Sequence, residues 1–402
     1  MFLILYFSVA LSFIGISFLF DISNGKVLTL VSLPTYLVFS LFPLHYELGL
    51  GSEWMEHRVY NFTYISWFWL VNILLSYPLS FITSYYIVYR FKNHHSNKCY
   101  SFCFSVERVK LLYLILALIS IVALFANLSF ASWNISLLFE NSRLWESMFG
   151  KFWFINYAYF LHIPALLMFV LLKYKNSNSY YHNIIALTLI FGSMFHGIKY
   201  TFFDALFFPL LFYIVLVGLY KIKYLVTVCA VLFMLFVSFY TLSIRGIGEE
   251  ADYFYFLKYM IPNVYNLFYS LELEPYPLGL PSQVIFSLGP DIIEQKGLIG
   301  GFILNDKYNM STGYRFIISG LGVLGPLIVL SAFITTYNLL SNRTIFNIFI
   351  KSFILFSLLM MFYSYYVGTK PKYIFLIMVV YLVSFFVKLF NERKKTEEKH
   401  FG

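Results

Sequence analysis

Apolar runs long enough to cross a bilayer recur along the whole chain and constrain its fold more than any other feature. The sequence is 60% hydrophobic and 12% charged, whereas a soluble domain carries about 25% charged residues. A helix of about 20 residues spans the bilayer core. The runs lie near residues 1–20, 27–44, 63–89, 111–127, 152–172, 184–198, 202–220, 224–242, 313–340, 346–366 and 373–390. The sequence therefore predicts an all-α polytopic membrane protein, with about 11 transmembrane helices in one domain over 1–402.

The distribution of Lys and Arg predicts how these helices are oriented, because short cytoplasmic loops are enriched in both residues. The stretch from Ile184 to Gly218 is too long for one span and carries Lys199 and Asp204 near its middle. Dividing it into two helices places most basic loops on one side: Lys26, Arg90, Lys92, Lys98, Arg108, Lys110, Lys173, Lys175, Lys221, Lys223, Arg343, Lys351 and the C-terminal tail. This predicts an outer N-terminus and a cytoplasmic C-terminus. Lys370 and Lys372 are exceptions, which we expect in the last short outer loop.

The longest hydrophilic stretch, 243–312, is predicted to be a large extracytoplasmic loop. It contains eight of the 19 acidic residues, namely Glu249, Glu250, Asp252, Glu272, Glu274, Asp291, Glu294 and Asp306. The loop is also rich in Pro, Tyr and Phe, which is unlike a disordered segment. We therefore expect it to fold onto the membrane surface.

Familiar cofactor motifs do not explain the sequence. GLGVLG at 320–325 matches the dinucleotide-binding pattern, but it lies in an apolar run without a preceding strand or an acidic ribose partner. We expect these glycines to allow close helix packing. No paired-cysteine or HExxH metal motif is present, and the net charge of +9 is scattered rather than gathered on a basic face. We thus expect no cofactor, no metal and no nucleic-acid partner.

Four cations are predicted near the outer interface of the membrane: Arg143, Lys199, Arg245 and Arg315. Cations at that depth are costly unless they are paired or reach the headgroups, so they are candidates for function. One alternative is that each side chain extends to lipid phosphates. If the four converge, they form a site for a phosphate or diphosphate, since guanidinium groups bind such oxygens bidentately.

Carboxylates on the same predicted side are candidates for a general base. Asp291 and Glu294 qualify by position, as do the acidic residues that follow Arg245: Glu249, Glu250 and Asp252. The alternative is that each is a solvated loop charge. His162 lies inside an apolar run, where we expect packing rather than catalysis.

Three segments together resemble bacterial O-antigen and capsule repeat-unit polymerases. They are FENSRLWESMFGKFWFINYAYFLHIP with its Arg143, HGIKYTFFDALFFPLLF between two short spans, and the long loop opened by SIRG and closed by NMSTGYRFIISGLGVLGPLIV. The resemblance covers much of the chain. It implies a GT-C-like helical fold and a glycosyltransferase that uses no nucleotide sugar.

The resemblance also implies the substrates and the location. The donor is a growing glycan on undecaprenyl diphosphate and the acceptor is one repeat unit on the same lipid, at the outer face of the inner membrane. A chain-length regulator protein is an implied partner. In this hypothesis Arg143 and Arg245 neutralise the leaving diphosphate, assisted by Lys199 and Arg315. An O-antigen ligase with the same donor, and a flippase for the same lipid, remain alternatives.

Overall fold

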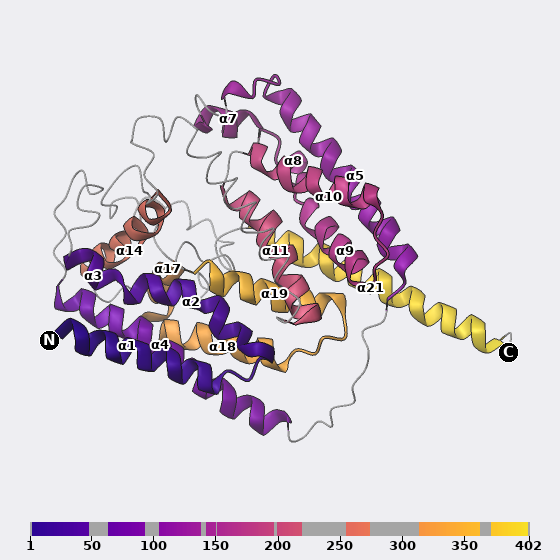
Figure 1. Ribbon diagram of the computed structural model, residues 1–402. Helices are drawn as coiled ribbons and strands as arrows, with labels where there is room; N and C mark the ends of the chain where they lie inside the picture. Colours follow the sequence, from indigo (N-terminus) through magenta and orange to yellow (C-terminus); the bar gives the residue numbers. More distant parts are fainter. Residues whose placement is uncertain are drawn as a thin grey trace. The chain divides into compact units, whose positions relative to one another are not determined.

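The computed structural model describes most of the chain, and every regular element in that part is a helix (Figure 1). The described residues are 2–47, 63–92, 104–137, 142–149, 151–196, 199–218, 255–273, 313–361 and 371–400. The predicted all-α class is therefore confirmed for these residues.

Among the described residues, five helical segments are long and apolar enough to cross a membrane: Asn24–Glu47, Tyr64–Phe91, Val106–Phe130, Trp153–Tyr174 and Gly322–Leu339. Five shorter apolar helices accompany them: Leu5–Phe20, Tyr180–Phe195, Thr201–Val217, Ile345–Leu359 and Lys372–Val387. These helices are consistent with a helical membrane protein. The total of about 11 spans stays a prediction, and the run near 224–242 lies outside the described residues.

The chain divides into two compact units, each built from separate stretches of sequence. Unit 1 comprises Met1–Lys98, Tyr253–Leu340 and Ile354–Pro371, and unit 2 comprises Cys99–Asp252, Ser341–Phe353 and Lys372–Gly402. The prediction of one membrane domain over 1–402 stays a prediction.

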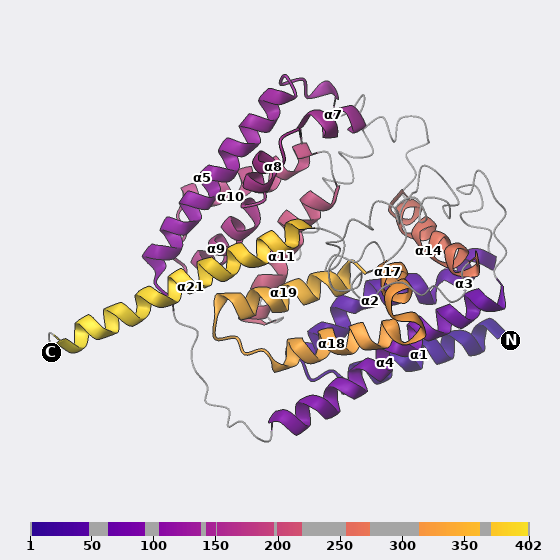
Figure 2. The same cartoon turned by 180° about the vertical axis from the view of Figure 1, so that it is seen from behind.

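Unit 1 is organised around α4, which packs along α1 and α18 (Figures 1 and 2). Its helices are α1 (Phe2–Phe20), α2 (Val27–Ser40), α3 (Phe42–Glu47), α4 (Tyr64–Lys92), α14 (Tyr255–Leu273), α17 (Gly313–Leu321) and α18 (Gly325–Leu339). Polar side chains on α4 donate hydrogen bonds to the segment that leads into α18 and to α18 itself. Asn72 Nδ2 donates to the Val323 carbonyl at 3.2 Å, and Ser80 Oγ donates to the Leu327 carbonyl at 3.2 Å. Such contacts are typical of helix packing in lipid, where apolar surface alone gives no preference for a neighbouring helix.

The expected single span over 313–340 was wrong, because glycines divide it into α17 and α18. Gly322 has φ of +60°, a conformation that L side chains rarely adopt. A Cβ atom on Gly325 would lie 2.6 Å from the Ile317 carbonyl oxygen, so only glycine fits there. The GLGVLG motif thus makes a turn and a close helix contact, as its expected packing role requires.

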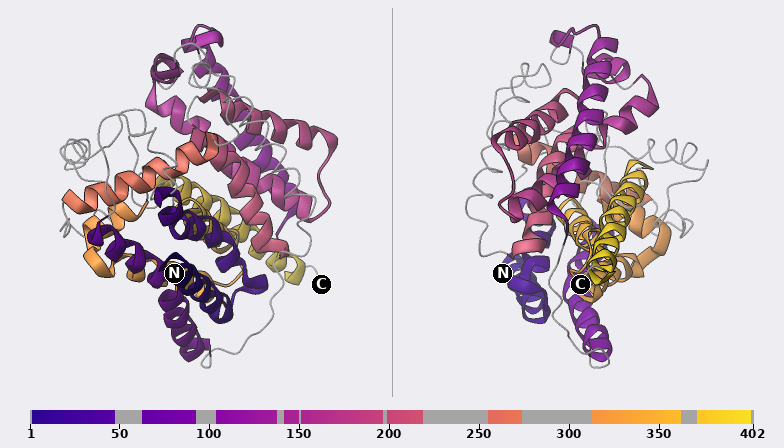
Figure 3. Two further views of the ribbon diagram at one scale, coloured as in Figure 1. Left: turned by 60° about the vertical axis from the view of Figure 1, so that its left-hand side comes forward. Right: turned by 90° about the vertical axis from the view of Figure 1, so that its right-hand side faces the viewer.

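Two carboxylates in unit 1, Asp21 fully buried and Glu272 half-buried, accept hydrogen bonds at the starts of two helices. Asp21 is fully buried, and its Oδ2 accepts from both the amide N (2.8 Å) and Oγ1 (2.9 Å) of Thr29 at the start of α2. Glu272 lies near the end of α14, which packs against α2 and α4 (Figure 3, salmon), and its Oε1 accepts from Thr63 Oγ1 at 2.6 Å and from Ser66 Oγ. Each carboxylate therefore satisfies donors at a helix N-terminus, which its negative charge also favours. Within the predicted outer loop, α14 is the described part, and it is folded.

Unit 2 is organised around α5 and α9, which pack along each other (Figure 2). Its helices are α5 (Val106–Phe130), α7 (Ser142–Phe149), α8 (Trp153–Tyr159), α9 (His162–Tyr174), α10 (Tyr180–Gly192), α11 (Lys199–Val217) and α21 (Pro371–His400). The helix α19 (Ile345–Leu359) contributes residues to both units. The predicted division of 184–218 is confirmed, since α10 and α11 are separate helices with a 3-10 turn at Ser193–His196 before α11.

Candidate functional site

A buried ion pair joins the beginning of α11 to the beginning of α21 in unit 2. Lys372 Nζ lies 2.7 Å from Asp204 Oδ2, and the two side chains are 10% and 0% exposed. The hydroxyl of Tyr373 donates to the same carboxylate, at 2.8 Å from Oδ1 and 2.9 Å from Oδ2. Asp204 therefore accepts from a cation and from a phenol, with no water needed to satisfy it.

Aromatic rings surround the ammonium group of this pair. Lys372 Nζ lies 4.5 Å from the centre of the Phe160 ring and 4.8 Å from the centre of the Tyr373 ring. Cation–π contacts of this kind partly replace the hydration that burial removes. A desolvated ion pair is nevertheless costly to place in a membrane helix, so such pairs are retained mostly where they serve a function.

The place of Lys372 differs from the sequence-based expectation. We expected Lys372 in the last short outer loop, as an exception to the charge rule for topology. It instead lies in the first turn of α21, buried against Asp204. Its positive charge is neutralised within the protein, so it does not count as a loop charge. Lys370 lies outside the described residues.

His162, the first residue of α9, is fully buried beside this ion pair. Its Nδ1 lies 2.8 Å from the carbonyl oxygen of Tyr159, and the rings of the two residues are 4.7 Å apart. Its Nε2 has no hydrogen-bond partner among the described residues. His162 and Lys372 have Phe160 as a common neighbour, since the centre of that ring lies 6.1 Å from the centre of the imidazole and 4.5 Å from Lys372 Nζ.

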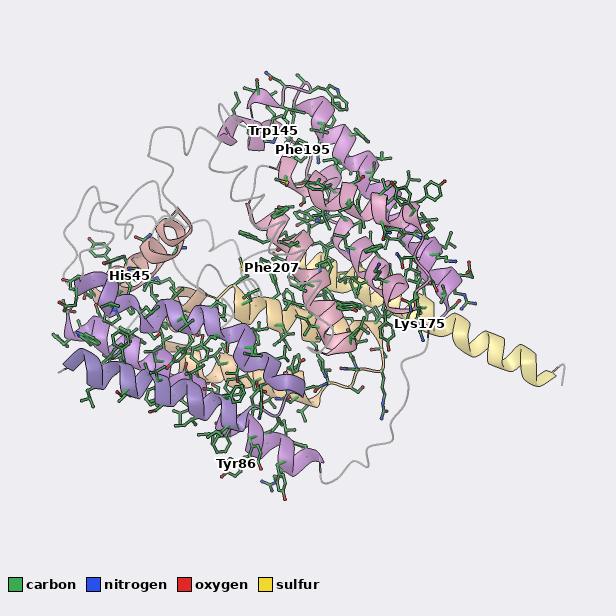
Figure 4. The ribbon with its side chains drawn as sticks, in the orientation of Figure 1. His45, Tyr86, Trp145, Lys175, Phe195 and Phe207 are labelled. Carbon is green, nitrogen blue, oxygen red and sulfur yellow. The ribbon has the colours of Figure 1, made fainter. Side chains whose placement is uncertain are left out.

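A second feature of unit 2 joins one segment that the sequence analysis singled out to the residue just before another. Trp145 on α7 is fully buried, and its Nε1 donates to the Phe195 carbonyl at 2.7 Å (Figure 4). Trp145 follows Arg143 by two residues, and Phe195 precedes Lys199 by four. Trp145 belongs to a hydrophobic cluster against which Phe195 packs, so the contact is both polar and apolar. The structure thus holds the helix of Arg143 against the turn that leads to Lys199.

The structure describes only some of the remaining predicted site residues. Arg143 lies in α7 and Lys199 begins α11, but their side chains lie outside the described part of the structure. Arg315 lies in α17 of unit 1 and is 5% exposed. The other predicted members, Arg245, Asp291 and Glu294, lie outside the described residues, as do Glu249, Glu250 and Asp252. The convergence of all four cations on one site therefore stays a prediction.

Sequence reasoning noticed Asp204 and Lys372 separately but did not pair them, and it missed Tyr373. The signal was present: Asp204 interrupts an apolar run, Lys372 immediately precedes one, the signs are opposite, and both lie near predicted outer helix ends. Two charges of this kind are expected to pair in lipid. Among the described residues, no group of three or more His, Cys, Asp or Glu side chains is placed to hold a metal ion.

Comparison of the chain with protein-family models, with characterised proteins and with solved structures finds no match. The functional argument therefore depends on the residues and contacts described above.

Proposed function

We propose that this protein is a membrane glycosyltransferase that polymerises lipid-linked oligosaccharide repeat units. The donor is a glycan on undecaprenyl diphosphate, and the acceptor is a repeat unit on the same lipid. Under this proposal the protein lies in the bacterial inner membrane and acts at its outer face, with the N-terminus outside and the C-terminus in the cytoplasm. The three segments that resemble repeat-unit polymerases support the proposal, as do the candidate membrane-spanning helices.

The hydrogen bond between Trp145 and the Phe195 carbonyl is the observation that carries the proposal furthest. It joins Trp145, in the first resembling segment, to Phe195, the residue immediately before the second, and these two segments contain the predicted diphosphate ligands Arg143 and Lys199. Two cations from different helices are suited to a leaving group with dispersed negative charge. The contact thus supports a diphosphate site at this end of unit 2.

The reaction needs few catalytic groups beyond these cations. A diphosphate is already a good leaving group, so neutralising its charge as the glycosidic bond breaks matters more than protonating it. The acceptor hydroxyl requires positioning and a general base. This chemistry requires neither a nucleotide nor a metal, which agrees with the motifs that the sequence lacks.

Purified protein supplied with lipid-linked repeat units tests the proposal directly. We expect longer glycans on a gel, and we expect elongation to continue in the presence of EDTA. Loss of elongation with EDTA and recovery with a divalent ion would refute a metal-independent mechanism. Absence of elongation by a folded, membrane-inserted protein would refute the polymerase itself.

Substitution of the predicted diphosphate ligands tests the site. We predict that Arg143→Ala and Arg245→Ala each lower the elongation rate by about two to three powers of ten, as the loss of one oxyanion donor does. The Lys replacements should recover part of the rate, because Lys supplies the charge without the guanidinium fork. Lys175→Ala is the matched control, because Lys175 is an exposed cation just after the C-terminal end of α9 (Figure 4). A normal rate in Arg245→Ala would instead assign Arg245 to the lipid interface.

A transporter of the same lipid-linked sugar is the second candidate function. The buried pair of Lys372 and Asp204 favours it, because ionisable pairs inside membrane helices also occur along transport pathways. The two functions are separated with proteoliposomes. A transporter moves repeat units between leaflets without lengthening them, whereas a polymerase lengthens them without moving them. An O-antigen ligase would transfer the glycan to a lipid A core acceptor rather than to another repeat unit.

A further inference from the structure

One ring nitrogen of His162, in the interior of unit 2, has no hydrogen-bond partner among the described residues. A carbonyl oxygen can only accept, so the 2.8 Å contact between Nδ1 and the Tyr159 carbonyl requires a proton on Nδ1. In the neutral imidazole, Nε2 then carries a bare lone pair. No donor to Nε2 is present among the described residues, although the side chain is 0% exposed.

Packing alone does not account for this arrangement. The burial of His162 agrees with the packing role expected from the sequence, but most buried polar atoms have at least one hydrogen-bond partner, and Nε2 has none among the described residues. The tautomer of His162 is held by Tyr159, and the nitrogen that remains is the one that can accept a hydrogen bond or a proton. A ligand that donates a hydrogen bond, such as a hydroxyl group, suits it.

The neighbours of His162 suit a base that is neutral before the reaction. The titratable groups gathered here come from three elements: Tyr159 from α8, Asp204 from α11, and Lys372 and Tyr373 from α21. Lys372 and Asp204 carry opposite charges 2.7 Å apart, so the pair brings little net charge to this network. The network reaches the surface at Lys372, whose side chain is 10% exposed.

We propose, on the basis of the transferase function above, that His162 is the general base of the glycosyl transfer. Nε2 accepts a hydrogen bond from the hydroxyl of the acceptor sugar and then takes its proton. The electron pair of the O–H bond remains on oxygen, which forms the new bond to the anomeric carbon of the donor. The bond from that carbon to the diphosphate breaks, and the diphosphate leaves with the electron pair. Catalytic hydrogen bonds commonly form only when substrate binds, so the enclosed resting state of Nε2 is compatible with this role.

The variant His162→Asn removes the proposed base but keeps a side-chain donor for the Tyr159 carbonyl. The Asn amide keeps an N–H donor for the Tyr159 carbonyl, but it has no atom that takes a proton at neutral pH. We expect elongation of lipid-linked repeat units, extracted from source cells that lack the gene, to fall about 10²- to 10⁴-fold. His182→Asn is the control, because His182 uses Nδ1 in a comparable local contact, with the backbone N–H of Ser179 on α10. A rate in His162→Asn equal to that of His182→Asn would overturn the proposal.

Two further measurements distinguish catalysis from folding. The elongation rate of the unaltered protein should rise with pH as the imidazole loses its proton, and His162→Gln should lose that pH dependence while keeping its KM. Retention of the same pH profile in His162→Gln would overturn the proposal. If the unaltered protein elongates nothing, the polymerase proposal fails. NMR of ¹⁵N-histidine-labelled protein then tests the hydroxyl site independently, since the extracted repeat unit should shift the His162 Nε2 resonance, and an unchanged resonance refutes the site.

Discussion

Both units bury carboxylates, but they satisfy them in different ways. In unit 1, Asp21 accepts from the backbone and hydroxyl of Thr29, and Glu272 accepts from Thr63 and Ser66. In unit 2, Asp204 accepts from the ammonium of Lys372 and from the phenol of Tyr373. Asp21 thus accepts from neutral donors at a helix start, whereas Asp204 pairs with a second buried charge.

This difference separates carboxylates that build the fold from one that is a candidate for function. A carboxylate at a helix N-terminus satisfies donors that would otherwise lack partners, and it interacts favourably with the helix dipole. Its presence is explained by folding alone. A buried ion pair requires desolvation of two charges, and apolar residues of similar volume are often as stable or more stable. Asp204 and Lys372 are therefore better explained by what unit 2 does than by how it folds.

The largest expected effect comes from removing one member of the unit 2 pair. Lys372→Met leaves the Asp204 carboxylate without a cation, and Asp204→Asn leaves the ammonium without an anion. Breaking a buried pair in this way lowers the free energy of unfolding by about 3–5 kcal/mol. The double variant removes both charges and should be more stable than either single variant. Thermal unfolding in detergent, analysed as a double-mutant cycle, measures the coupling between the two residues.

Elongation assays on the same three variants sharpen the comparison. If the pair serves function, the double variant regains stability but not activity. Full activity in a stable double variant would show that the pair is structural, and the two units would then not differ in this respect.

The features that the sequence predicted are those that depend on local composition and length. The all-α class follows from apolar runs, and the division of 184–218 follows from a run too long for one span. Pairing of Asp204 with Lys372 depends on residues 168 positions apart, which no local pattern reveals. The turn at Gly322 escaped prediction for another reason, since glycine in an apolar run is equally compatible with an unbroken membrane helix.

The candidate site was predicted in part for the same reason. Arg143 and Lys199 were chosen because cations near an interface are costly, and that argument needs only their position in the sequence. The residue that brings their segments together, Trp145, lies in the resembling segment but carries no charge to mark it. Its buried N–H and its contact with Phe195 became evident only from the folded chain.

A smaller effect is expected when the unit 1 carboxylate Asp21 is removed. Asp21→Ala deprives the amides of Ser23 and Thr29 of their acceptor, and we expect a loss of about 2 kcal/mol, near the upper end for a helix cap. Elongation per folded molecule should be unchanged, because Asp21 only holds the start of α2. Asp21→Asn keeps an acceptor oxygen and is the matched control. A selective loss of elongation in Asp21→Ala at normal stability would contradict the contrast between the units.

The smallest expected effect concerns a neutral contact within unit 1, between Ser80 on α4 and the Leu327 carbonyl on α18. Ser80→Ala removes one hydroxyl that links two helices, and interhelical hydrogen bonds in membrane proteins average about 0.6 kcal/mol. Ser76→Ala is the matched control on the same helix, because Ser76 Oγ donates to the Ile73 carbonyl within α4 at 2.6 Å. Thermal unfolding should therefore show a small decrease for Ser80→Ala and a smaller one for Ser76→Ala. A loss at Ser80 as large as that of Lys372→Met would mean that neutral contacts in unit 1 are as strongly coupled as the buried charges of unit 2. The contrast between a weak neutral contact such as that of Ser80 and the costly ion pair of Asp204 and Lys372 would then fail.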